Sequence, residues 1–332
     1  PTCGVSHFTP LFWVGFNRHV QCNRCATVFV SPRPKRERIV LTPAHERLQK
    51  GRAKLLSDIK TSEPLENVHV VNSYVTPEAR LRVLVLDVGF GMGKTLAALK
   101  EAGYPAEHLF GIETDEENVR TVAEFLEQEY SMTGIRDRLF VGTDPVAAVG
   151  GRKFDVVIVS SVVEHLSRPR GFVHRIRDLL NEGGKVIITQ LPDIDSTWAQ
   201  ALSGSFTHYS SPTHLQHWGR VRIQQLLEDA GFEVVTVSAK TAKSLTVDKL
   251  LQFLRPYRLG ERYYFLGEEI TPEEAQTSGD VFWRPQDSEI VHRAIIKHRD
   301  NPGVLRRELF KLWRADPATI EKYRQAADVE PI

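Results

Sequence analysis

Short apolar runs alternate with amphipathic stretches through the middle of the chain. The runs RVLVLD, HLFGIE, RLFVGT, FDVVIVS, KVIITQ and FEVVTVS have the length and β-branched content of buried strands. Between them lie the helix-like stretches GKTLAALKEAG, EENVRTVAEFLEQEY, RGFVHRIRDLLNEGG and RVRIQQLLEDAG. Apolar strands separated by helices predict an α/β fold, in which a parallel sheet is covered on both faces. Ligands of such sheets bind at the carboxyl ends of the strands.

The sequence divides into four predicted segments. The alternation of strands and helices occupies one of them, residues 81–240. Residues 1–34 hold all three cysteines, and residues 35–80 form a predicted helical linker, in which Thr42 and Pro43 suit the start of a helix. Residues 241–332 contain helix-like stretches without a clear motif and are predicted to form a helical extension, either a lid or a dimerisation surface. The stretch RYYFLG within this last segment is the candidate for a final antiparallel strand of the sheet.

Composition and charge describe an ordinary globular protein. Of 332 residues, 41% are hydrophobic and 26% charged, and no apolar run approaches the ~20 residues that span a bilayer. We therefore expect a soluble, cytoplasmic protein without a membrane partner. The net charge of +1 gives no global attraction to nucleic acid. Between Arg18 and Lys60, however, eleven lysines and arginines face only three acids, which indicates either a solvated surface or a phosphate-binding segment.

The stretch VLVLDVGFGMGKT, residues 83–95, places three glycines after a predicted strand. A phosphate-binding P-loop would need glycine at position 88, where the chain has Val88. The dinucleotide fingerprint fails as well, because Gly93 comes one position too early. The pattern that fits is an acid, Asp87, followed by glycine at positions 89, 91 and 93.

Together with two later motifs, this loop resembles the class I S-adenosylmethionine-dependent methyltransferases. SSVVEHLSRP supplies Glu164, His165, Leu166 and Pro169 of a signature found in the group related to the ubiquinone-biosynthesis O-methyltransferases. PTHLQHWGRVRIQQLLEDAGFEVV is similar to a further segment of that group, with Trp218 in place of the usual phenylalanine. The resemblance covers roughly residues 83–237. It implies a Rossmann-like, doubly wound, mostly parallel seven-stranded sheet and S-adenosylmethionine as the cofactor.

The cofactor contacts follow from the ends of the predicted strands. Glu113 closes the second strand, and a carboxylate there can accept hydrogen bonds from two ribose hydroxyls; the alternative is a solvated acid before a helix. In this family the residues after the third strand, here Thr143 and Asp144, contact the adenine. The resemblance implies cofactor binding by Asp87, Gly89, Phe90, Gly91, Gly93, Glu113, Thr114, Thr143, Asp144, Ser160 and Ser161.

Cys22 and Cys25 form a C-x-x-C pair, and Cys3 lies upstream. With a fourth cysteine directly before Pro1, the spacing would be that of a zinc ribbon, and His7 or His19 are the alternative fourth ligands. The segment resembles the N-terminal zinc ribbon of deoxysugar C-methyltransferases, which implies a structural Zn²⁺ held by Cys3, Cys22 and Cys25. The alternative is three reduced thiols.

Three functions remain in competition. The first is methyl transfer from S-adenosylmethionine to an O, N or C acceptor on a small molecule, a sugar or specialised metabolite, with His165, His217 and His214 as candidate bases. The second is an RNA methyltransferase that grips nucleic acid with its basic N-terminal zinc module, although the strand-four end lacks the motifs of the base-modifying enzymes. The third is a non-catalytic binding subunit, which the intact glycine loop disfavours.

Overall fold

The computed structural model describes residues 3–4, 6–33, 62–210, 213–239, 254–276, 288–298 and 300–327. The chain forms two compact units. The parallel unit comprises residues 39–191 and 224–236, and the antiparallel unit comprises residues 1–38, 192–223 and 237–332. The units cut across the four segments that the sequence suggests, because residues 192–223 belong with the N-terminal strands rather than with the glycine loop.

The parallel unit is built on a five-stranded sheet with the order β6-β5-β4-β7-β8. Every neighbouring pair in this sheet is parallel. The central strand β4 is wholly buried and its neighbour β7 nearly so, as strands covered on both faces must be. The strands are β4 (Val85–Val88), β5 (Leu109–Glu113), β6 (Leu139–Val141), β7 (Phe154–Ser160) and β8 (Leu180–Thr189).

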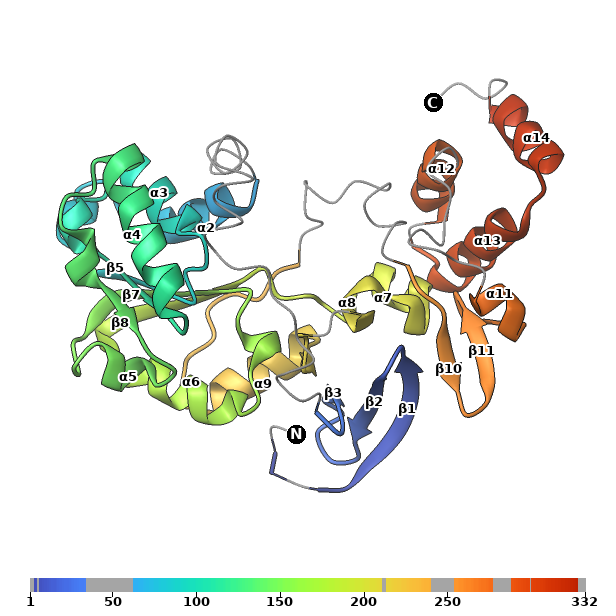
Figure 1. The fold of residues 1–332 in the computed structure, drawn as a ribbon, viewed down its shortest axis with the longest axis horizontal. Coiled ribbons are helices and arrows are strands. Elements are labelled where there is room, and N and C mark those ends of the chain that lie inside the picture. The colour runs from blue at the N-terminus through green and yellow to red at the C-terminus, as the bar shows by residue number, and fades with distance from the viewer. Residues whose placement is uncertain are drawn as a thin grey trace. The chain divides into compact units, whose positions relative to one another are not determined.

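Helices cover both faces of this sheet (Figure 1). On one face, α2 (Ser62–Asn72), α3 (Lys94–Glu101) and α4 (Glu116–Tyr130) pack their apolar side chains, among them Val71, Leu96 and Leu126, against the strands. On the other lie α5 (Pro145–Ala148) and α6 (Pro169–Arg177). Successive parallel strands joined by helices in this way confirm the predicted Rossmann-like, doubly wound fold.

Four details of the predicted fold are wrong. In the described part of the chain the parallel sheet has five strands, not seven. FEVVTVS forms no strand, and Val235 in it is 63% exposed, so the alternating valines do not bury a face. RYYFLG contributes β11 (Arg262–Phe265), which belongs to the other unit. The helix predicted through residue 184 ends at Arg177, because β8 begins at Leu180 and pairs with Phe154.

The antiparallel unit contains a seven-stranded sheet with the order β12-β11-β10-β1-β2-β3-β9. The N-terminal strands β1 (Phe8–Val14), β2 (Asn17–Cys22) and β3 (Val28–Val30) lie between partners from far along the chain. One side is β9 (Gln216–His217), and the other is β10 (Tyr257–Leu259), where Trp13 pairs with Arg258. The sheet ends with β11 and β12 (Glu268–Ile270).

Helices complete the antiparallel unit. Leu202 of α7 and Leu305, Leu309 and Leu312 of α13 share a buried cluster with Phe265 of β11. The remaining C-terminal helices confirm the predicted helical extension. The bounds are α7 (Thr197–Leu202), α8 (Thr207–Ser210), α11 (Pro272–Gln276), α12 (Ser288–His298), α13 (Pro302–Arg314) and α14 (Pro317–Ala327), and α9 (Arg220–Asp229) crosses the boundary between the units in sequence.

Two further predictions concern the helix of the linker and membrane-spanning segments. The helix expected after Thr42 lies outside the described residues. Across the segments that the structure describes, no helix is both long enough and apolar enough to cross a bilayer.

Candidate functional site

The glycine loop follows β4 at the carboxyl edge of the parallel sheet. Gly89, Gly91 and Gly93 all have positive φ, at 75°, 54° and 70°. A Cβ at Gly89 would stand 2.6 Å from Val162 Cγ2, and one at Gly93 would stand 2.7 Å from Val122 Cγ1. A Cβ at Gly91 would meet nothing closer than the Gly89 carbonyl at 4.0 Å. Packing therefore excludes a side chain at the outer two glycines, whereas the middle one borders open space.

Glu113 holds this middle glycine from the end of β5. Its Oε2 accepts a hydrogen bond of 3.1 Å from the backbone N–H of Gly91, and its Oε1 accepts one of 2.7 Å from the backbone N–H of Thr114. The Gly91 carbonyl in turn accepts a hydrogen bond of 2.8 Å from Asn118 Nδ2. Asn118 was not predicted as a site residue, although its place three residues after Asp115, which caps α4, was a usable signal.

Asp87 lies beneath the loop as a fully buried carboxyl group. Burial, and to a smaller extent the nearby charge of Glu113, raise the pKa of Asp87 to about 7. A buried acid with a like charge beside it resists ionisation, and a cation bound nearby would oppose both effects. The predicted residues Asp87 and Glu113 therefore form one electrostatic unit.

The predicted adenine contacts follow the end of β6, and one of them, Asp144, has other partners in the fold. Thr143 and Asp144 are both exposed. Asp144 caps α5 by accepting hydrogen bonds from the N–H groups of Val146 and Ala147. It also pairs with Arg175, at 2.7 Å from the guanidinium, and this hydrogen bond lowers the pKa of Asp144. Both of its oxygens thus serve the fold in this structure.

The end of β7 carries the predicted serines and the acid–histidine pair. Ser160 ends the strand, and Ser161 has a positive φ of 52° and donates from its hydroxyl to the Gln190 carbonyl at 3.4 Å. Glu164 is 2% exposed, and burial raises its pKa to about 7. Glu164 Oε2 makes no hydrogen bond within the described structure, and its Oε1 lies 3.9 Å from His165 Nε2. His165 is the more exposed member of the pair, with 37% of its side chain exposed.

The remaining predicted site residues belong to the antiparallel unit. The thiols of Cys3, Cys22 and Cys25 lie within 4.8 Å of one another, and the Cys3 and Cys22 sulfurs are 3.4 Å apart. Four thiolates at about 2.3 Å from a tetrahedral Zn²⁺ stand about 3.8 Å apart, so the cluster fits such an ion. Within the described residues neither His7 nor His19 joins the cluster, which corrects the alternative for a fourth ligand.

His19 and His217 form a buried group of their own. Their ring centroids are 4.9 Å apart, and Tyr209 lies 5.2 Å from the first and 4.7 Å from the second. Burial lowers the pKa of His19 to about 4, against a smaller effect of the Asn17 backbone. Burial, and then the neighbouring histidines, lower the pKa of His217 well below its usual value. The candidate bases His214 and His217 thus lie in a different unit from His165.

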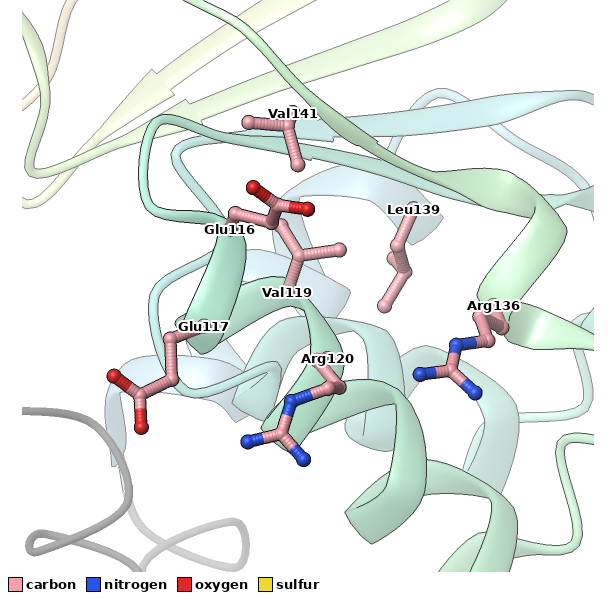
Figure 2. A pocket seen from close by; sticks show the side chains of 7 residues that line it. All are labelled: Glu116, Glu117, Val119, Arg120, Arg136, Leu139 and Val141. Carbon is pink, nitrogen blue, oxygen red and sulfur yellow. The ribbon is translucent and has the colours of Figure 1, made fainter.

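A surface pocket of about 600 Å³ lies elsewhere on the parallel unit (Figure 2). It opens between the start of α4 and the edge strand β6. None of the predicted site residues lines it, so the pocket is no part of the candidate site. Its walls are Glu116, Glu117, Val119, Arg120, Arg136, Leu139 and Val141.

Comparison with known proteins agrees with the sequence motifs. Residues 42–237 match the family described as "Methyltransferase domain". Ubiquinone biosynthesis O-methyltransferase of Caulobacter sp. (strain K31) is 29% identical over 116 residues, which are 35% of this chain and 43% of the relative. The same enzyme of Cereibacter sphaeroides (strain ATCC 17029 / ATH 2.4.9) is 27% identical over 121 residues, 36% of this chain and 46% of the relative. The chain thus spans less than half the length of these curated relatives.

Two solved structures are similar to part of the chain. Glycopeptide N-methyltransferase MtfA with bound S-adenosylmethionine is 21% identical, with a TM-score of 0.32, over 39% of this chain and 54% of the other. Magnesium protoporphyrin IX methyltransferase (ChlM) from Synechocystis PCC 6803 is 16% identical, with a TM-score of 0.37, over 60% of this chain and 77% of the other.

Proposed function

The chain belongs to the methyltransferase-domain family, and from this premise we propose that it transfers the methyl group of S-adenosylmethionine to an O, N or C acceptor on a small molecule. The acceptor class we favour is a sugar or other specialised metabolite. The observation that carries the proposal is Gly91, whose open Cβ direction and N–H bond to Glu113 leave the loop backbone accessible beside a carboxylate. A nucleoside cofactor needs this combination, because its ribose presents two hydroxyls as donors.

The chain's own groups have separable roles in holding the cofactor. Glu113 accepts from the ribose hydroxyls, and the flat glycine backbone lies against the amino-acid portion. Asp87 becomes ionised when the positively charged cofactor binds, because the cation offsets both causes of its raised pKa. Phe90, Thr114, Ser160 and Ser161 complete the set, and Thr143 contacts the adenine through its exposed side chain. Asp144 takes part only if a ligand replaces its Arg175 partner.

When bound, S-adenosylmethionine supplies a methyl group on a sulfonium sulfur, and the C–S electron pair stays on sulfur as the acceptor's lone pair forms the new bond. The residues must hold the acceptor in line and remove its proton. We assign the removal of this proton to His165, which is half-exposed and whose Nε2 lies 3.9 Å from Glu164 Oε1. An ionised Glu164 would orient this ring and stabilise its protonated form. The other candidate bases, His214 and His217, belong to the antiparallel unit and take no part in this assignment.

A structural zinc ion in the antiparallel unit is a further part of the proposal. Cys3, Cys22 and Cys25 supply three thiolates at suitable spacing. Strands β1, β2 and β3 bring these cysteines together over a small apolar cluster of Val20 and Phe29. Such a small core gains stability from a metal, and a site closed by protein ligands does no chemistry.

The experiment that tests the proposed function has two stages. Calorimetry first measures binding of S-adenosylmethionine to the wild-type chain and to Glu113→Ala. Labelled methyl transfer is then followed into an extract divided into small-molecule, protein and RNA pools. Label that enters the small-molecule pool with the wild type alone supports the proposal. Label in the RNA pool would replace it with the nucleic-acid alternative, and a chain that binds no cofactor would refute it.

A further inference from the structure

Asn67 occupies a core-facing position of α2 where an apolar residue would be expected. It is 1% exposed, it directly precedes buried Val68, and it lies one turn before buried Val71. Asparagine is a poor helix former, and a buried amide costs free energy unless it is hydrogen-bonded. The presence of an amide here therefore needs a reason other than packing.

Three hydroxyl groups from distant parts of the chain surround this amide. Asn67 Nδ2 donates to Thr95 Oγ1 at 3.0 Å and to Ser160 Oγ at 3.3 Å, and Asn67 Oδ1 accepts from Thr189 Oγ1 at 2.6 Å. Both donor hydrogens of the amide are thus used, together with its carbonyl oxygen. The three hydroxyl residues are separated from Asn67 by 28, 93 and 122 positions in sequence.

All three hydroxyls stand at the carboxyl edge of the parallel sheet. Thr95 is the second residue of α3, directly after the glycine loop. Ser160 ends β7 and pairs in register with Thr189, which ends β8. Ligands of parallel sheets bind at this edge, so α2 reaches the candidate cofactor site through one buried side chain.

The chemistry of the amide sets the direction of these hydrogen bonds. An NH₂ group can only donate, so Ser160 Oγ must accept from Asn67 and keeps its own proton for another acceptor. Ser160 is half-buried, so this proton can reach a ligand at the sheet edge. The amide thereby turns a hydroxyl that can rotate freely into a directed donor.

We infer that Asn67 is a positioning residue that fixes the Ser160 hydroxyl as a hydrogen-bond donor to an oxygen of bound S-adenosylmethionine. The inference rests on the proposed function, because it takes this molecule as the ligand. Asn67 itself does not touch the cofactor and acts through Ser160. The helix α2 is in this way a part of the cofactor site.

The test is a double-mutant cycle with cofactor affinity, measured by calorimetry, as the readout. Asn67→Asp preserves shape but leaves only acceptors, so the Ser160 hydroxyl must turn its proton toward position 67. We expect about tenfold weaker binding in Asn67→Asp and in Ser160→Ala. The combination should bind no more weakly than either single variant, because both remove the same donor. S-adenosylmethionine carries a net positive charge, so an added carboxylate would not weaken binding by electrostatics.

Asn72→Asp is the matched control, since it makes the same change on the same helix. Asn72 Oδ1 accepts a hydrogen bond of 2.8 Å from the Tyr104 hydroxyl. A carboxylate at position 72 can accept the same hydrogen bond. This variant should bind within twofold of the wild type. Thermal unfolding without cofactor shows whether each variant is folded.

Wild-type affinity in Asn67→Asp, or losses that multiply in the double variant, would overturn the inference. Should Asn67→Asp fail to fold, Ser160→Ala decides alone, and unchanged affinity there overturns it. A wild-type chain that binds no S-adenosylmethionine would instead refute the proposed function, so the two failures are distinguishable.

Discussion

Glu113 Oε2 accepts a hydrogen bond of 3.1 Å from the backbone N–H of Gly91, and so ties the end of β5 to the middle of the glycine loop. The same carboxylate holds the backbone N–H of Thr114 through its other oxygen. The acid therefore has a structural role in the loop before any ligand arrives. A ribose would then meet a carboxylate whose orientation is already fixed.

Replacement of Glu113 by glutamine should separate charge from shape. The amide oxygen can still accept from Gly91, but the second oxygen and the negative charge are lost. We expect about tenfold weaker binding of S-adenosylmethionine with little change in stability, because a charged hydrogen bond contributes about 1.5–3 kcal/mol. Calorimetry measures the affinity. Glu116→Gln, an exposed acid at the start of α4, is the control, and an equal loss in both would argue against a specific contact.

Alanine at Gly93 should mainly lower the stability of the fold, whereas alanine at Gly91 should mainly weaken cofactor binding. Gly93→Ala combines a φ of 70° with a Cβ 2.7 Å from Val122, so we expect a loss of about 2–3 kcal/mol in the free energy of unfolding. The added Cβ of Gly91→Ala meets no atom closer than 4.0 Å, and its backbone strain alone costs about 1–2 kcal/mol. Its methyl group would point into the open space next to the loop, where we propose that the cofactor binds. Chemical denaturation and calorimetry should therefore find Gly91→Ala the more stable variant and a poor binder, and cofactor binding at wild-type affinity would contradict this.

The local part of this site could be predicted from the sequence. Asp87, the three glycines and Glu113 lie in one strand–loop–helix–strand run, whose apolar spacing and φ requirements are readable residue by residue. Asn67 could not be found in that way. Its three partners are remote in sequence, and its own helix shows only a polar residue among valines.

The antiparallel sheet was beyond prediction for the same reason. Trp13 pairs with Arg258, and Val28 pairs with His217, across stretches that share no local pattern. The cysteine spacing correctly placed three thiols together, yet it gave no sign that their strands continue into β9 and β10. Long-range pairing of short strands is decided by which faces become buried, and the exposed valines of FEVVTVS show that alternation alone is insufficient.

Asp87 should make the parallel unit less stable as the pH rises. Its folded pKa of about 7 lies above the unfolded value near 3.8, so its contribution is complete below pH 4 and is lost as the pH rises through about 7. The difference of about three pH units corresponds to about 4 kcal/mol at most. Amide exchange in β4 between pH 4 and 8, compared with Asp87→Asn, measures the effect. The same pH dependence of amide exchange in the wild type and in Asp87→Asn would exclude this role of Asp87.

The cysteine cluster predicts that the purified chain carries about one zinc ion. Elemental analysis measures the metal, and Co²⁺ substitution should give the absorption of a metal–thiolate bond. Cys22→Ser should lose the ion and destabilise the antiparallel unit, because Cys22 is buried between the other two thiols and Phe29. Tryptophan fluorescence reports on this unit selectively, since all five tryptophans fall within its residue ranges. Metal-free wild-type protein of unchanged stability would rule out the zinc site.

His19 should make the antiparallel unit sensitive to acid. Its folded pKa of about 4 lies below the ordinary value of 6.5, so its contribution to stability is present above pH 6.5 and is lost as the pH falls toward 4. The loss reaches about 3 kcal/mol, because a charged imidazole would be buried against Phe12 and beside His217. His19→Phe keeps a ring to stack on Phe12 and removes the charge.

Urea denaturation followed by tryptophan fluorescence tests this at pH 7 and at pH 4.5. The wild type should lose far more stability between the two conditions than His19→Phe does. His7→Phe is the control, since it makes the same change at an exposed histidine of the same unit. If His19→Phe is as acid-sensitive as the wild type, the acid response comes from other groups, with buried His217 the first to examine, because its pKa is lowered by the same burial.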